Sequence, residues 1–339
     1  MHKYNKRTYS KIVQSKLRRT KMQIVRIVKL PYLLICFLLF IILWLLSHPS
    51  CAPYMNSIRG TQFSHLQPES SSLSRLVKEI ATEDKMVIIT MVDREWAKPD
   101  SILDLFLESI RIGERTKYLL NHLIVVALDD QALRYCLRAH PHCYLHRGYR
   151  KNSESLNPDG LVTGWSKKYL VKEILELGYN IMFTEADVIW LSNPILHCNP
   201  LDPIQVACGI SPSDHLTVEN TGGFFYAKSN YVTIHLFKTL DVERVVYPAT
   251  GNQSLCDIVK RQDVIQNLSM KVTFLDDANF GRFCQPNNSQ DRSKISTVHA
   301  SCCNDTKSKV HYLKLILQDR KKMNPQWIIP SQCRGFHPL

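Results

Sequence analysis

The sequence lacks the short motifs that mark several large enzyme classes. It has no G-x-G-x-x-G dinucleotide fingerprint, no phosphate-binding P-loop and no H-E-x-x-H zinc motif. It therefore provides no support for a dehydrogenase, a kinase or a metalloprotease. It also has no Cys-x-x-Cys pair, so its 11 cysteines favour disulfide bonds over a zinc site.

The first 29 residues contain no acidic side chain, although they hold ten of the 43 lysines and arginines. The other 310 residues carry 33 basic and 30 acidic side chains, so the net charge of +13 is concentrated in the N-terminal tail. A nearly neutral body does not offer the broad cationic surface that binds phosphate backbones. We therefore expect no nucleic-acid partner.

An uncharged, strongly apolar run follows the basic tail, from Leu30 to Leu46. Its seventeen residues are at the short end of what crosses a ~30 Å hydrocarbon core. Because the positive charge precedes the run, we predict a cytosolic tail at 1–29, a signal anchor at 30–47 and a lumenal body. The alternative is a cleaved signal peptide, whose apolar region is normally ~7–15 residues long and whose charged region is shorter.

Two features of the body agree with a lumenal location. Four Asn-x-Ser/Thr glycosylation sequons lie beyond the apolar run, at Asn252, Asn267, Asn287 and Asn304. Nine cysteines also lie in the body, and an oxidising compartment would pair eight of them. We expect Cys136 to pair with Cys143, across a His140-Pro141-His142 segment that otherwise resembles a metal cluster.

The body alternates between apolar strands and amphipathic helices. Residues 48–85 are rich in Ser, Pro and Gln and are predicted to be a stem. Beyond them we expect strands at Met86–Met91, Leu123–Leu128 and Tyr179–Phe183, and helices at Ser101–Ile112 and Lys167–Leu177. This order predicts a mainly parallel α/β sheet with crossover helices. With no internal repeat or second linker, residues 86–339 are predicted to form one domain.

Acidic residues follow three of the predicted strands, beginning at Asp93, Asp129 and Glu185. Ligands of such sheets bind beyond the carboxyl ends of the strands. Glu185 and Asp187 are two residues apart, so both can face one side and share a divalent cation. Such a cation neutralises the charge on a departing nucleoside diphosphate. The alternative is that the two are solvated loop acids or a helix N-cap.

The segment around these acids is similar to a known family. Residues 177–194, Leu-Gly-Tyr-Asn-Ile-Met-Phe-Thr-Glu-Ala-Asp-Val-Ile-Trp-Leu-Ser-Asn-Pro, closely resemble the aspartate-x-aspartate block of the plant-type nucleotide-diphospho-sugar transferases, glycosyltransferase family 77. Further blocks resemble the family in the same order, at Ile88–Asp129, Thr221–Asn230, Gln262–Val264, Phe280–Cys284 and Val298–Cys303. The resemblance covers about residues 86–325.

The resemblance implies a GT-A fold, in which a Rossmann-like sheet binds a sugar nucleotide through Mn²⁺ or Mg²⁺. It implies a single-pass type II Golgi membrane enzyme, alone or in a homo- or hetero-oligomer. The reaction would move a pentose such as arabinose or xylose, with retained configuration, from a UDP-sugar to a cell-wall glycan or glycoprotein. The alternative is a non-catalytic partner subunit of a Golgi transferase complex, because the family usually has Asp where Glu185 stands.

The family pattern also assigns roles to residues of this chain. Asp187 and His299 match metal ligands, and Glu185 would lie on the metal's water shell or on the ribose. Lys309 is a candidate for holding the diphosphate. For His299 the alternative is a structural histidine near a disulfide. Lys167, with Lys168 at the start of a predicted helix, could meet phosphate, although a solvated position is the simpler expectation.

Five further residues are candidates for contact with the donor or acceptor. Asp93 could contact the uridine or cap the next turn. Gly222 and Gly223 allow close backbone approach and positive φ, so they could line the sugar pocket or form a tight turn. Asn220 and Asp263 are catalytic candidates that could hydrogen-bond the sugar or the acceptor, and Asp263 could instead be a helix N-cap.

Overall fold

The computed structural model describes most of the predicted body. The described residues are 69–147, 158–208, 223–246, 253–283, 294–301, 303 and 305–320. The tail and anchor predicted at 1–47 lie outside them. Within the described ranges, no helix has the length and apolar composition that a membrane span requires.

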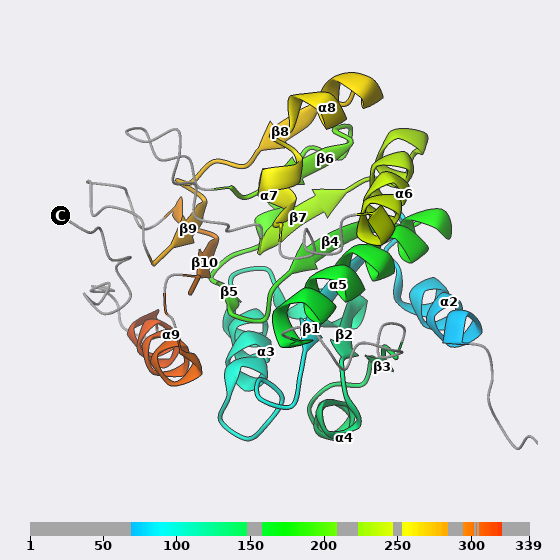
Figure 1. The fold of residues 1–339 in the computed structure, drawn as a ribbon. Coiled ribbons are helices and arrows are strands. Elements are labelled where there is room, and N and C mark those ends of the chain that lie inside the picture. The colour runs from blue at the N-terminus through cyan, green and yellow to red at the C-terminus, as the bar shows by residue number, and fades with distance from the viewer. Residues whose placement is uncertain are drawn as a thin grey trace, which may run out of the picture. The chain divides into compact units, whose positions relative to one another are not determined.

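A seven-stranded sheet forms the centre of the fold (Figure 1), in the order β3-β2-β1-β4-β7-β6-β8. Its strands are β1 Met86–Val92, β2 Leu123–Ala127, β3 Cys143–Leu145, β4 Asn180–Thr184, β6 Ile204–Val206, β7 Phe224–Ala227 and β8 Val272–Phe274. Strands β3, β2, β1 and β4 are parallel, whereas β7 runs antiparallel to both β4 and β6. The predicted mainly parallel α/β sheet is confirmed.

Each face of the sheet carries its own hydrophobic core, which is why the central strands are apolar throughout. Residues of β1 alternate between the two: Ile88 belongs to one core, and Val87 and Ile89 belong to the other. The helices that pack against these cores are α2 Glu69–Ile80, α3 Ile102–Ile112, α4 Asp130–Ala139, α5 Pro158–Glu176, α6 Tyr231–Val246, α7 Leu255–Ile258, α8 Gln262–Leu268 and α9 Thr306–Arg320. Helices α3, α4 and α9 supply the first core, and α2, α5 and α6 the second.

Two helices differ from the expected boundaries. Helix α5 begins at Pro158, upstream of the predicted start at Lys167. Helix α2 falls within the range predicted as a stem, and its Leu73 and Val77 are fully buried. The folded body therefore extends back at least to Glu69.

A second, three-stranded sheet joins distant parts of the chain, in the order β5-β10-β9. Its strands are β5 Val188–Trp190, β9 Phe280–Arg282 and β10 Thr297–His299. The register pairs His299 with Val188 on one side and with Arg282 on the other. In addition, the Ala300 amide donates to the Asp187 carbonyl at 3.1 Å. This sheet brings the end of β10 beside the acidic segment after β4.

Most cysteines of the described residues are disulfide-bonded. The expected Cys136–Cys143 bond is confirmed, and Cys208 pairs with Cys256. Cys303 is also disulfide-bonded. Cys198 carries a free thiol, and burial raises its pKa to about 12, so it is poorly reactive at neutral pH.

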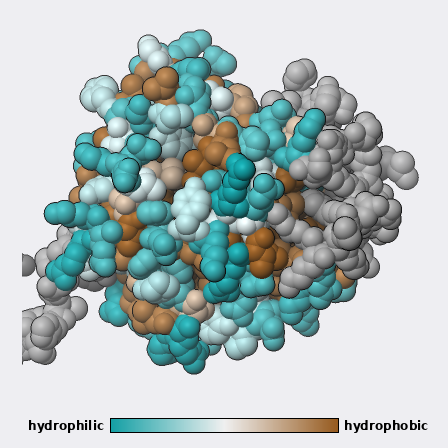
Figure 2. All heavy atoms as spheres, turned by 180° about the vertical axis from the view of Figure 1, so that it is seen from behind, coloured by the Kyte–Doolittle hydropathy of each residue, from teal (hydrophilic) through white to brown (hydrophobic). Residues whose placement is uncertain are grey.

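The surface is predominantly polar on the face opposite to that of Figure 1. Figure 2 shows that hydrophobic side chains reach this face as small areas separated by hydrophilic ones. Isolated apolar residues of this kind are normal on a folded domain. The large apolar side chains of the described chain lie chiefly in the two cores.

Two buried histidines predict that stability falls on acidification. His140 and His146 are each 5% exposed, and burial lowers the pKa of both. A histidine of the unfolded chain has a pKa near ~6.5. Below that pH the unfolded chain therefore binds more protons than the folded protein, and the free energy of unfolding decreases. We expect His146→Phe to reduce the fall in Tm between about pH 7 and about pH 5. His235→Phe, at an exposed position of α6, is the control, and an identical fall in wild type and His146→Phe would contradict the prediction.

Candidate active site at the carboxyl edge of the sheet

A tight acidic turn follows β4 at the carboxyl edge of the parallel strands. The amide of Glu185 donates to the Gly223 carbonyl at 2.6 Å, and the amide of Val188 donates back to the Glu185 carbonyl at 3.1 Å. Asp187 lies between β4 and β5 and is 1% exposed, whereas Glu185 is half-buried. These backbone bonds direct both carboxylates toward β10.

Three potential ligand atoms converge at the end of β10. His299 Nε2 lies 3.3 Å from Glu185 Oε2 and 3.3 Å from Asp187 Oδ1. Asp187 Oδ1 is buried and accepts no hydrogen bond among the described residues. Two carboxylates and an imidazole, with ligand atoms all within 4.8 Å of one another, could hold a metal ion. This donor set suits a divalent cation such as Mn²⁺, so the site fits the predicted metal.

Two lysines form ion pairs with the other oxygen of each of these carboxylates. Lys167 Nζ lies 2.5 Å from Glu185 Oε1, and Lys309 Nζ lies 2.6 Å from Asp187 Oδ2. The oxygens that face His299 are therefore not the ones paired with ammonium groups. The structure places Lys309, the candidate for holding the diphosphate, beside the acids, and it places Lys167 there as well.

An aromatic ring supports each of these lysines. Lys167 Nζ lies 4.6 Å from the centroid of the Phe183 ring, and Lys309 Nζ lies 5.3 Å from that of Trp96. Cation–π contact of this kind favours the ammonium and fixes its direction. Trp96, in the loop after β1, thereby becomes a part of the site that the sequence analysis did not assign.

The charges of the cluster determine the protonation of its members. Burial alone would raise the pKa of Asp187 and Glu185, but the charges of His299, Lys309 and Lys167 hold both pKa values below their usual range. Burial alone would lower the pKa of His299, but the two carboxylates raise it to about 9. Both acids are therefore ionised at neutral pH.

Gly223 lies directly against this cluster, at the entry to β7. A Cβ at this position would lie 2.5 Å from His299 Cε1 and 2.9 Å from Glu185 Oε2. Its φ lies outside the left-handed region, so close approach, and not the positive φ expected from the sequence, is what requires glycine. Gly222 and Asn220 lie outside the described residues.

Two other candidates make no direct contact with the acids, His299 or the two lysines of the cluster among the described residues. Asp93 Oδ1 accepts from the amides of Glu95 and Trp96, at 2.9 and 3.0 Å, as expected for a turn cap. Asp263 is exposed in the first turn of α8 and pairs with Arg261 at 2.8 Å. Helix α8 lies far from β10 (Figure 1). Contact of either acid with a ligand stays a prediction.

A family model described as "Nucleotide-diphospho-sugar transferase" matches residues 118–313. The match spans more than half of the chain and contains the acids, His299 and both lysines of the cluster. The chain belongs to the nucleotide-diphospho-sugar transferase family. It is therefore a glycosyltransferase, and the cluster at the carboxyl edge is the candidate active site of an enzyme that takes sugar from a nucleotide diphosphate.

Two curated relatives extend the match beyond this segment. Both are uncharacterized proteins of Arabidopsis thaliana. One is 33% identical over 263 residues, which are 76% of this chain and 69% of the relative. The other is 33% identical over 304 residues, which are 83% of this chain and 87% of the relative.

Solved glycosyltransferase structures are similar only at a distance. One is a glycosyltransferase involved in the glycosylation of the major capsid of PBCV-1, with 10% identity and a TM-score of 0.43 over 68% of this chain and 98% of that one. Another is mouse xyloside xylosyltransferase 1, with 11% identity and a TM-score of 0.39 over 63% of this chain and 97% of that one. The family assignment rests on the sequence matches.

Proposed function

We propose that this glycosyltransferase has the GT-A arrangement and depends on a divalent metal, with Mn²⁺ as the favoured ion. It takes a sugar from a UDP-sugar and transfers it with retained configuration to a cell-wall glycan or glycoprotein. A pentose such as arabinose or xylose is the favoured sugar, and family 77 the favoured subgroup, on the sequence resemblance. The observation that carries the proposal is the convergence of Glu185, Asp187 and His299 on one point.

The charge of the cluster is suited to a metal-bound diphosphate. The negative charges of the two carboxylates equal the positive charges of the two lysines, so the net charge of the cluster is zero when His299 is neutral. A bound divalent cation supplies two positive charges. These neutralise the two negative charges of the diphosphate in a nucleotide-sugar and stabilise the nucleoside diphosphate as a leaving group. The residues of this chain therefore provide a diphosphate site whose charge depends on the metal.

Lys167 and Lys309 are placed to contact the same diphosphate. Their side chains are partly exposed, and each ammonium is held between a carboxylate oxygen and an aromatic ring. An ammonium on a flexible stem can exchange one oxygen partner for another. We propose that both lysines donate to phosphate oxygens while the rings limit their movement.

The glutamate at 185 is compatible with this role. Its extra methylene is accommodated because Lys167 binds Oε1, while Oε2 stays 3.3 Å from His299 Nε2. One oxygen thus still faces the other candidate ligands. The non-catalytic alternative, which depended on this departure from the family pattern, gains no support from the geometry.

Calorimetry of the purified full-length protein tests metal-dependent donor binding. We expect UDP to bind in the presence of Mn²⁺ and its affinity to fall at least about tenfold when EDTA removes the metal. Without the cation the positive charge of the cluster is reduced to that of the protonated His299, whose pKa is about 9. Hydrolysis of a panel of UDP-pentoses and UDP-hexoses would identify the sugar. UDP binding that is absent, or unchanged by EDTA, would reject the metal-dependent function and favour the partner-subunit role.

The Golgi location is part of the same proposal. Disulfides such as Cys136–Cys143 and Cys208–Cys256 are typical of oxidising compartments, and so support a lumenal body. Protease treatment of sealed Golgi vesicles tests the topology. The body should be protected until detergent is added, and digestion without detergent would reject the type II orientation.

A further inference from the structure

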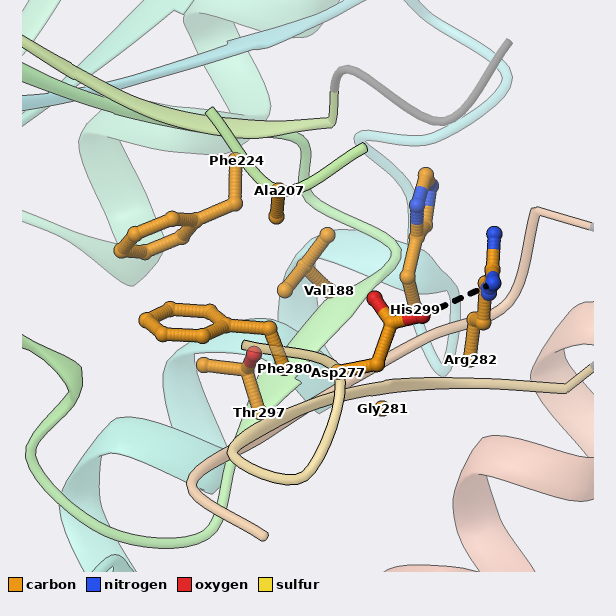
Figure 3. Close-up of a pocket in the computed structure, with 9 residues that line it drawn as sticks. All are labelled: Val188, Ala207, Phe224, Asp277, Phe280, Gly281, Arg282, Thr297 and His299. Atoms are coloured by element: carbon orange, nitrogen blue, oxygen red, sulfur yellow. Dashed lines mark hydrogen bonds and ion pairs between the residues drawn. The ribbon is translucent and has the colours of Figure 1, made fainter. Parts of the chain in front are cut away.

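A small cavity adjoins the candidate active site, and its walls differ in character (Figure 3). Val188, Phe224 and Phe280 form an apolar wall, and Asp277, Arg282 and His299 form a polar one. The cavity offers about 20 Å³ to the centre of a water-sized group, which is room for about one such group. All of the empty space there, open solvent included, is about 290 Å³.

His299 connects this cavity to the acidic cluster. Its imidazole faces Glu185 and Asp187 through Nε2, yet the residue also lines the cavity. On the adjacent strand β9, Arg282 is its register partner, so the two residues lie side by side on the small sheet. A donor whose diphosphate occupied the cluster could therefore extend its sugar toward Arg282.

The polar wall contains an ion pair with an unused donor. Arg282 Nη2 lies 3.1 Å from Asp277 Oδ2, and the two side chains are 12% and 23% exposed. Arg282 Nε is buried and has no hydrogen-bond partner among the described residues. A buried donor without an acceptor is destabilising. Arg282 lines the cavity, so an oxygen atom of a ligand there would lie beside its guanidinium group.

The chemistry of the cavity favours an uncharged ligand with hydroxyl groups. Because Asp277 balances the charge of Arg282, the pair does not attract an anion as an isolated arginine would. Together they offer a carboxylate acceptor and a guanidinium donor, and the phenylalanines offer a surface for C–H groups. A sugar ring presents both kinds of group.

We propose that this cavity is the sugar subsite of the donor, and that Asp277 and Arg282 determine which sugar is accepted. The proposal rests on the function proposed above. The enclosed space admits one hydroxyl-sized substituent, so the ring itself lies at the mouth. The pair then distinguishes sugars by the presence and orientation of that substituent, since a site built around a hydroxyl group rejects analogues that lack it.

The test compares UDP with UDP-sugars on Arg282→Gln, using full-length protein with Mn²⁺ present. We expect the Kd for UDP to stay within about twofold, while kcat/KM for the preferred UDP-sugar falls about 10- to 100-fold and the order of preference among sugars changes. Asp277→Asn should act in the same direction. Arg111→Gln, which removes an exposed arginine paired with Glu108 at 3.8 Å on α3, is the control and should leave all values unchanged.

Two outcomes would overturn the proposal. Equal weakening of UDP and UDP-sugar would place Arg282 on the diphosphate or in a structural role, and an unchanged sugar preference would remove it from the subsite. If Arg282→Gln fails to fold, Arg282→Lys carries the test, because lysine keeps the charge beside Asp277 but has no Nε–H donor. Wild-type protein that does not bind UDP with Mn²⁺ would instead reject the proposed function itself.

Discussion

Replacing Asp187 by Asn is expected to lower kcat/KM for the UDP-sugar by about 10³-fold. Asp187 is buried, and both of its oxygens face cationic or potential metal-binding partners: Oδ1 faces His299, and Oδ2 binds Lys309. An amide has nearly the same shape but no charge, so it weakens metal binding and leaves Lys309 without its counterion. Mn²⁺-dependent UDP binding, measured by calorimetry, should be lost together with activity.

Asp202 offers a matched control for this substitution. It is a buried carboxylate that pairs with Lys271 at 2.5 Å and accepts from Thr273 at 2.9 Å. It has no contact with the acidic cluster among the described residues. Asp202→Asn should therefore destabilise the fold without changing the activity of the folded protein. If Asp187→Asn retained metal-dependent activity, the assignment of Asp187 as a metal ligand would be wrong.

The central strands could be predicted because their signal is local. β1 and β2 are continuous apolar runs, and such runs form where helices cover both faces of a parallel sheet. The small sheet could not be predicted. Its strands have three residues each, and β10 pairs with β5, more than 100 residues earlier. Helix α2 was not predicted because its serine-rich start has the composition of a linker, although Leu73 and Val77 have helical spacing.

The acidic half of the site could be proposed without the family resemblance, because Glu185 and Asp187 are two residues apart after a buried strand, although this spacing also fits solvated loop acids. His299 and Lys309 could be placed only by resemblance to the family, since the strand pairing that brings them to the acids is not local. The sequence also places Asp129 among the acids at this edge, but in the structure Asp129 caps a helix. Asp129 ends a strand at the same edge, but its Oδ1 accepts from the amides of Gln131 and Ala132 as the N-cap of α4.

Gly223→Ala is expected to lower kcat/KM by about 100-fold while the protein still folds. The added Cβ would lie 2.5 Å from His299 Cε1, closer than non-bonded carbons can approach, so the imidazole must move. Glu185 is affected as well, because its Oε2 would lie 2.9 Å from the new atom. A shift of about 1 Å in the candidate ligands is sufficient for a loss of this size. Steady-state kinetics and thermal unfolding measure the two effects separately.

Gly178→Ala separates this effect from a general cost of replacing glycine. Gly178 has a φ of +88° just after α5, and a Cβ there would meet nothing within 4 Å. Alanine at Gly178 should cost about 1 kcal/mol of folding free energy because of its backbone conformation, yet leave kcat/KM unchanged. The φ of Gly223 lies outside the left-handed region, so alanine there does not strain the backbone and instead displaces the His299 side chain. Activity should therefore fall far more than stability. Normal kcat/KM and unchanged Mn²⁺-dependent UDP binding in Gly223→Ala would show that His299 does not need the position it holds beside Glu185 and Asp187.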